Sequence, residues 1–213
     1  PGRLTDWQNL GPPKMFTTRP TDHSMQLTIH DSETAPDASR DMLTKSQARY
    51  KFVPNLHGIM AGAPVMYEAY QAIGQIYAKS GMSVLERQVV LQSINFENEC
   101  HYCLAAHSLI ATAEKMPPDI LAALREGRPL KDAKLQALRV FAAQMTRERG
   151  WLSPAEVQAF YDAGYGEATL LEVIVAVAYK VMSNYINHIA ETPLDAAFQP
   201  YAWKRPTPLD TGA

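Results

Sequence analysis

The spacing of hydrophobic residues along the chain predicts helices through its central and C-terminal parts. Apolar positions recur at helical spacing in segments separated by proline and glycine, and no run of strands with a period of two is present. We expect helices at about residues 38–50, 64–79, 84–94, 101–115, 119–126, 135–150, 153–163 and 167–191. Pro54, Asn55 and Gly58 are expected to stop the first helix and to leave His57 in a loop. The predicted fold class is all-α.

The last predicted helix has a wider apolar band than a helix with one solvent-facing side needs. We expect it to lie at the centre of the molecule or at a contact between subunits. The band comprises Leu170, Leu171, Ile174, Val175, Val177, Ala178, Val181 and Met182.

The first 33 residues differ in character from the rest of the chain. They contain several prolines and many polar residues, without sustained periodicity. We expect a tail over residues 1–33 and a single all-α domain over residues 34–213. Met25 is a candidate start of the natural chain, with the residues before it added by an expression vector.

Composition and charge limit the classes of partner. A net charge of −2, with 46% hydrophobic and 20% charged residues, gives no electrostatic reason to expect nucleic acid or an anionic membrane as a partner. No segment approaches the roughly 18 apolar residues of a membrane span, and the N-terminus lacks the pattern of a secretion signal. The expected location is cytoplasmic. No glycine-rich phosphate loop is present, so no cofactor is predicted.

Both cysteines of the chain lie within one predicted helix. Helical spacing places Cys100, Cys103 and His107 near one face, about one turn apart. In a reducing compartment such a pair is more often catalytic or metal-binding than structural. The metal interpretation requires a further ligand, from His101, Glu97, Glu99 or a distant histidine. Redox catalysis is favoured, and metal binding or an inert pair remain alternatives.

The redox interpretation assigns a role to each group. A helix N-terminus favours the thiolate of Cys100, and His107 is a candidate proton acceptor for Cys103. One thiolate would reduce a peroxide and become a sulfenic acid, which the other sulfur would capture as a disulfide. Glu86 could orient His107 and store the proton, but it also sits three residues after Ser83, where it would complete a capping box.

Other polar residues near the motif are weaker candidates. His101 could tune Cys100 electrostatically, and Tyr102 could donate a hydrogen bond, but solvation and packing are their simpler interpretations. His57 and His188 are more often structural in such positions.

With these residues assembled, the chain resembles the alkylhydroperoxidase D-like (AhpD-like) branch of the carboxymuconolactone decarboxylase family, particularly its peroxidase-related members. The resemblance covers about residues 50–203. It rests on the Val-Pro-Asn-Leu sequence at 53–56, the Leu-Glu-Arg sequence at 85–87, the Cys-His-Tyr-Cys-Leu-Ala-Ala-His motif at 100–107 and the segment at 184–195. Where the hydroperoxidase proper has a histidine before its second cysteine, this chain has Tyr102.

The resemblance implies an AhpD-like helical bundle that assembles as a homotrimer or homohexamer. It implies a thiol-dependent hydroperoxidase, an antioxidant oxidoreductase whose partners are a hydroperoxide and a thiol or dithiol reductant. Cys103 would take the peroxide or share the disulfide, Cys100 would exchange with the outside thiol, and Glu86 and His107 would relay protons. Which sulfur attacks first stays open. A carboxymuconolactone decarboxylase-like lyase, which would not need the dithiol, and a metal-binding or structural helical module are the alternatives.

Overall fold

The computed structural model describes residues 27–206, and over this range the chain folds into helices without any strand. The all-α prediction is therefore confirmed. The elements are α1 (Asp37–Tyr50), α2 (Asn55–Ala61), α3 (Pro64–Tyr77), α4 (Val84–Glu97), α5 (His101–Ala113), α6 (Pro118–Glu126), α7 (Ala133–Arg147), α8 (Pro154–Asp162), α9 (Glu167–Ala190) and the 3₁₀ helix η2 (Ala196–Tyr201).

Local sequence signals account for several helix ends. Ser83 and Ser153 each form a capping box with the glutamate three residues later, at the starts of α4 and α8. Helix α6 ends at Gly127, which has a positive φ of 71°. A Cβ atom at Gly127 would lie 2.5 Å from the ring of Phe96, so this turn requires glycine for its space as well as its backbone.

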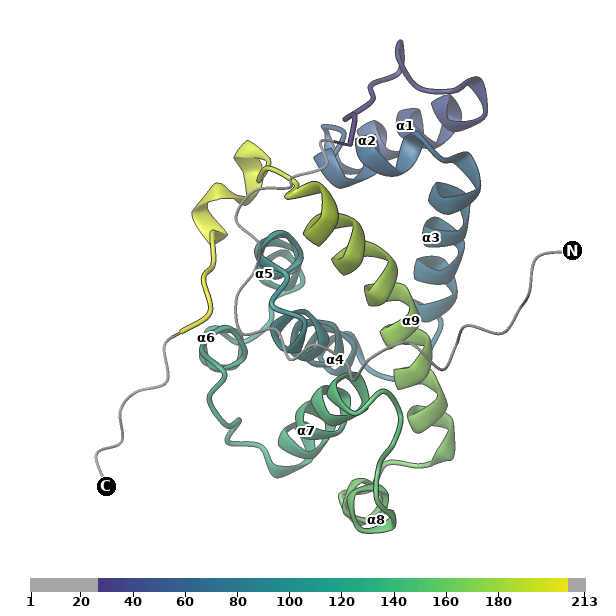
Figure 1. The fold of residues 1–213 in the computed structure, drawn as a ribbon. Coiled ribbons are helices and arrows are strands. Elements are labelled where there is room, and N and C mark those ends of the chain that lie inside the picture. The colour runs from purple at the N-terminus through teal and green to yellow at the C-terminus, as the bar shows by residue number, and fades with distance from the viewer. Residues whose placement is uncertain (1–26, 207–213) are drawn as a thin grey trace, which may run out of the picture.

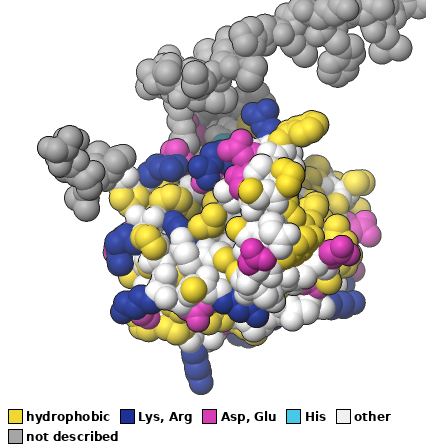
Figure 2. Space-filling model, turned by 90° about the horizontal axis from the view of Figure 1, so that it is seen from below, with side chains coloured by type: hydrophobic (Ala, Val, Ile, Leu, Met, Phe, Trp, Pro, Cys, Tyr) yellow, Lys and Arg dark blue, Asp and Glu magenta, His cyan; other side chains and the backbone are white. Residues whose placement is uncertain are grey.

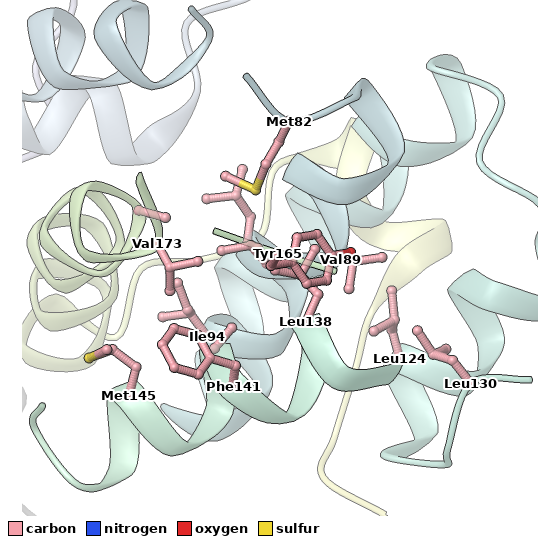
Figure 3. Packing of buried hydrophobic residues seen from close by; sticks show 14 of the residues in the cluster. Met82, Val89, Ile94, Leu124, Leu130, Leu138, Phe141, Met145, Tyr165 and Val173 are labelled. Carbon is pink, nitrogen blue, oxygen red and sulfur yellow. The ribbon is translucent and has the colours of Figure 1, made fainter. Parts of the chain in front are cut away.

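Helix α9 crosses the middle of the molecule (Figure 1), with α3 along one side and α4 and α5 along the other. The larger hydrophobic cluster lies where α4 packs against α7 and α9 (Figure 3); its members include Val89, Ile94, Leu138, Phe141 and Val173. The smaller cluster lies between α1, α2, α3 and the start of α5, and it includes both cysteines. The cysteines are thus part of the packed interior.

Two segments depart from the sequence-based expectation. Residues 55–61 form helix α2 rather than a loop, because Pro54 occupies the N-cap position and six consecutive residues from Leu56 to Ala61 are buried. Helix η2 was not anticipated, and its Phe198 packs edge-on against Tyr102 with 5.5 Å between ring centroids. Both segments contribute to the walls around Cys103.

The predicted N-terminal tail lies mostly outside the described residues. Of its last residues, His30 is held on α2, because its backbone N–H donates to the carbonyl of Gly58 at 3.1 Å. A Cβ atom at Gly58 would meet that same segment at 2.7 Å, so glycine permits the close approach. The described part of the tail is therefore attached to the domain.

The molecular surface mixes charged and hydrophobic side chains, as the face in Figure 2 shows. On α9 a row of apolar residues faces outward, comprising Leu171, Ile174, Tyr185 and Ile189. By length and composition alone, α9 is apolar enough to cross a membrane, contrary to our expectation for the sequence. One such helix is weak evidence for a membrane span, and the opposite face of α9 carries buried polar residues.

Candidate active site

The first turn of α5 carries both thiols into the protein interior. Cys100 is the N-cap residue of α5, and its backbone N–H donates to the carbonyl of Asn95 at 3.0 Å. Glu99 precedes it with a positive φ of 54°, which turns the chain sharply between α4 and α5. Cys100 and Cys103 are both buried and both are free thiols. The expected placement of Cys100 at a helix N-terminus is found.

Asn187 of α9 spans the two sulfurs. Its Nδ2 atom donates to Cys103 Sγ at 3.2 Å and lies 3.8 Å from Cys100 Sγ. The amide is buried, and its Oδ1 atom has no hydrogen-bond partner among residues 27–206. An amide fixed in this way favours negative charge on Cys103, because a donor stabilises a thiolate more than a thiol.

A chain of side-chain contacts runs from the interior to the surface. Lys180 Nζ lies 3.1 Å from His107 Nε2, His107 Nδ1 lies 3.3 Å from Gln88 Oε1, and Gln88 Nε2 donates to Glu114 Oε2 at 2.8 Å. A carboxylate only accepts, so the amide N–H₂ of Gln88 must face Glu114 and its oxygen must face His107. The imidazole then carries its proton on Nδ1 and accepts from Lys180 at Nε2.

Lys180 is the buried charge of the site. Its side chain is 1% exposed, and in the described part of the chain no carboxylate lies within 4 Å of its nitrogen. Burial lowers the pKa of His107 well below its usual value, and the neighbouring Lys180 lowers it further, which keeps the imidazole neutral. A buried ammonium without a carboxylate is costly unless another anion is available, and the nearby thiolate is the group that can supply it.

The two thiols have opposite acidities. Burial alone would raise the pKa of Cys103, but the hydrogen bond from Cys100 and the charge of Lys180 lower it to about 5. Burial, with the neighbouring Cys103, raises the pKa of Cys100 well above its ordinary value. This order is the reverse of that expected from the helix N-terminus alone, because burial and the neighbouring Cys103 outweigh the effect of the backbone on Cys100.

Glu86 is not brought to His107. Its carboxylate accepts from the backbone N–H and hydroxyl of Ser83 and from the hydroxyl of Tyr165 at 3.1 Å. Both ring nitrogens of His107 are instead bonded to Gln88 and Lys180. The capping box with Ser83 and the hydrogen bond from Tyr165 engage the Glu86 carboxylate. The side chain that holds His107 is Gln88, two residues further along α4.

Tyr102 lines the cavities beside both sulfurs, but its hydroxyl bonds to other groups. Its hydroxyl donates to Asp195 Oδ2 at 2.5 Å and accepts from the backbone N–H of Leu56 at 3.3 Å. Asp195 also accepts from the backbone N–H of Asn55, which ties the start of α2 to the segment after α9. Tyr102 therefore connects the walls of the site.

The dithiol is reached from two sides. A cavity of about 60 Å³ lies beside Cys103 and is also lined by His107, Lys180 and several aromatic rings. A separate cavity of about 260 Å³ lies beside Cys100, between the start of α5 and the end of α9. His101 and His188 line this second cavity, with Glu99, Asn187 and Glu191. Cys103 and Cys100 therefore line different cavities.

Cys103 and His107 line one cavity, but the ring nitrogens of His107 bond to Gln88 and Lys180 rather than to Cys103. The contributions of Lys180, Asn187 and Gln88 were not foreseen. Lys180 lies within the broad apolar band of the last helix and Asn187 follows it, so polar residues on such a helix were the available signal. His57, a weak candidate, lies in α2 against Ser46 and lines the cavity beside Cys103. Among residues 27–206, no group of three or more histidine, cysteine or acidic residues could hold a metal ion.

Comparison with solved structures identifies the fold. The chain superimposes on an AhpD-core, peroxidase-related protein from Ralstonia eutropha JMP134 with a TM-score of 0.72 and 19% identity, covering 80% of this chain and 92% of that one. A peroxidase-related protein from Silicibacter sp. TM1040 gives 0.70 and 22% identity, covering 85% and 97%. A cysteine-to-alanine variant of the debrominase Bmp8, in complex with 2,3,4-tribromopyrrole, gives 0.71 and 17% identity, covering 84% and 97%.

The fold is therefore the AhpD-like helical fold, as the resemblance implied. No family model matches the chain, and no curated protein matches it. The debrominase shows that proteins of this fold have activities other than peroxide reduction, so the fold alone does not select the reaction.

Proposed function

We propose that the protein is a thiol-dependent hydroperoxidase in which Cys103 is the nucleophile and Cys100 resolves the oxidised sulfur. The observation that carries this proposal is the pairing of a buried, acidic Cys103 thiol with Lys180 and with a second thiol one turn away. A thiolate at neutral pH is the reactive form of cysteine. A neighbouring thiol gives the first oxidation product an immediate partner.

The reaction can be written with its atoms balanced. The Cys103 thiolate attacks the terminal oxygen of a hydroperoxide, the O–O bond breaks, and the products are a Cys103 sulfenic acid and an alkoxide. The alkoxide takes a proton, for which we assign the buried Lys180 ammonium, whose charge acts on Cys103, and leaves as an alcohol. The Cys100 thiol then condenses with the sulfenic acid, which forms the Cys100–Cys103 disulfide and releases water. Two equivalents of an external thiol, or one dithiol, restore both thiols.

The two cavities support the assignment of Cys103 as the nucleophile and Cys100 as the resolving thiol. The cavity beside Cys103 is small and largely aromatic, as suits a compact substrate. The cavity beside Cys100 has more than four times that volume and is lined mainly by polar residues, so it suits an external thiol compound. We place the reductant on the Cys100 side for this reason.

A test follows directly from the assignment. The reduced protein is treated with one equivalent of cumene hydroperoxide, and intact mass and sulfenic acid trapping by dimedone are measured for wild type, Cys100→Ser and Cys103→Ser. We expect loss of two hydrogens in wild type, reversed by dithiothreitol, a dimedone adduct in Cys100→Ser, and no reaction in Cys103→Ser. An adduct in Cys103→Ser alone would reverse the assignment. Unreactive thiols, with turnover of a carboxylated lactone that survives alkylation, would favour the lyase instead.

We propose further that the protein self-associates through the outward row on α9, defined by Leu171, Ile174, Tyr185 and Ile189. These residues recur at helical spacing and at least 44% of each side chain is exposed, so they form one apolar strip along the helix. A second copy of the chain is the partner we favour, because the resemblance implies an assembly of identical subunits. Assembly as a trimer or hexamer would follow the resemblance.

A further inference from the structure

The cavity beside Cys103 adjoins a larger groove on the surface. The groove has a volume of about 260 Å³ and lies between α1, α3 and the middle of α9. Four aromatic side chains line both the groove and the inner cavity, namely Tyr50, His57, Tyr70 and Tyr179. A molecule seated in the groove would therefore lie against the wall of the cavity that contains Cys103.

The charges around this groove are of one sign. Lys45 and Arg49 of α1 line it, and no aspartate or glutamate lines either the groove or the inner cavity. Neither cation forms an ion pair with a carboxylate in residues 27–206. The guanidinium of the exposed Arg49 lies 5.3 Å from the ring centroid of Tyr50, which places its charge beside the aromatic wall. An anionic group is the natural occupant of such a position.

The shared wall offers flat aromatic surface. Tyr70 and Tyr179 are stacked with 4.7 Å between their centroids, and Tyr50 meets His57 edge-on at 5.6 Å. Burial, aided by the charge of Arg49, lowers the pKa of His57 to about 4, so its ring is neutral at pH 7. A neutral aromatic wall favours planar rings through offset or edge-on contacts, whereas the two cations at the groove disfavour cationic ligands.

We propose that this groove selects hydroperoxides whose organic part is an aromatic ring carrying a carboxylate. The proposal rests on the proposed function and specifies its substrate class. The carboxylate lies near Lys45 and Arg49, the ring lies against the four shared side chains, and the hydroperoxide points to Cys103. The inner cavity of about 60 Å³ exceeds the roughly 10–15 Å³ that a single water needs, so it has room for the two oxygens of a hydroperoxide.

A kinetic comparison tests the carboxylate. The substrates are cumene hydroperoxide, the same compound with a para carboxylate, and tert-butyl hydroperoxide. We expect wild type to have a kcat/KM about tenfold higher for the carboxylated compound than for cumene hydroperoxide, consistent with a partly screened charge pair. The ratio should fall towards one in Arg49→Gln, and also in 0.5 M NaCl, where the Debye length is only a few ångströms. Equal kcat/KM values for the two aryl substrates in wild type would overturn the proposal.

Matched variants separate the groove from a general effect of net charge. Lys131→Gln removes an exposed cation that lines neither cavity, and it should leave the ratio unchanged. Tyr50→Leu should lower kcat/KM for the aryl substrates towards that of tert-butyl hydroperoxide, since it removes one wall of the groove. A ratio that falls equally in Lys131→Gln and Arg49→Gln would contradict a local site.

A binding measurement keeps this inference separable from the proposed reaction. The unreactive probe 4-isopropylbenzoate is titrated by calorimetry into wild type, Arg49→Gln and Lys131→Gln. We expect binding to wild type and Lys131→Gln, and about tenfold weaker binding to Arg49→Gln. If no hydroperoxide is turned over but the probe binds with this pattern, the groove binds aryl carboxylates and the proposed hydroperoxidase activity is wrong. If peroxides are reduced but the probe does not bind, the hydroperoxidase stands and the substrate class is wrong.

Discussion

The Nζ atom of Lys180 lies 3.1 Å from Nε2 of His107 in the interior, so a lysine and not the imidazole presents the positive charge of the site. Removing that charge should raise the pKa of Cys103 from about 5 towards the ordinary cysteine value, because the ammonium stabilises the thiolate. We expect Lys180→Gln and Lys180→Met to shift the pH midpoint of Cys103 alkylation upward by at least one pH unit.

The measurement is the iodoacetamide rate against pH in the Cys100→Ser background, which leaves Cys103 as the single thiol. The Cys100→Ser protein with Lys180 intact is the reference, and its rate should fall at acid pH as the Cys103 thiolate is protonated. Since Gln retains a donor for His107 while Met does not, similar shifts in both variants identify the charge as the cause. An unchanged midpoint in both would refute this role of Lys180.

Gln88 and Glu86 lie on the same helix and should have separable effects. Gln88→Leu removes the acceptor that holds the proton of His107 on Nδ1, so we expect kcat/KM for hydroperoxide to fall by about tenfold through misorientation of the imidazole. Glu86→Ala should cost about 1 kcal/mol of stability through loss of the capping box, with little change in kcat/KM. Urea unfolding and peroxidase kinetics on both variants provide the check. A large kinetic loss in Glu86→Ala would restore the proton-relay role expected from the sequence.

Burial of His57 predicts sensitivity to acid. Its folded pKa of about 4 lies below the ordinary 6.5, so the unfolded chain binds more protons between these values, and stability falls as the pH decreases from 6.5 towards 4. The difference corresponds to about 3 kcal/mol. His57→Gln should show a correspondingly shallower pH dependence of the unfolding free energy, measured in urea at pH 7.5, 5.5 and 4.5. Parallel curves for the two proteins would show that His57 is not responsible.

If the outward row on α9 is a subunit contact, a charged substitution in it should lower the mass of the assembly. Ile174→Glu places a charge in the apolar strip, so we expect it to dissociate the assembly to monomers in sedimentation at micromolar concentration. Val65→Glu on α3 is the control, because Val65 is 81% exposed and lies outside the strip. If the wild-type protein already sediments as a monomer, the proposed self-association is wrong.

Local periodicity was sufficient to predict most helices and the grouping of the thiols. Cys100 caps α5, and Cys103 and His107 lie within its first two turns, so their spacing follows from the geometry of one helix. The residues that tune them are distant in sequence: Lys180 and Asn187 reach α5 across separations of 73 and 84 positions. Such contacts depend on how α9 packs across α5, which a single sequence does not specify.

Two differences between the sequence-based expectation and the structure have physical causes. Glu86 and Gln88 are two residues apart, which is a rotation of about 200° on a helix, so the choice between them required the rotational position of α4 relative to α5. Pro54 was interpreted as a helix stop, although proline fits equally well just before a helix begins. The short helix α2 is explained by burial of its side chains more than by local propensity.

Helix α9 presents Lys180 and Asn187 to the thiols on one face and the apolar strip to solvent on the other. If closing the disulfide shifts this helix, contact with a second copy and the redox state become thermodynamically linked. If oxidation changes the affinity between subunits by some factor, assembly must change the equilibrium constant for oxidation by the same factor. The midpoint potential of the dithiol would then depend on protein concentration, although no thiol lies in the strip itself.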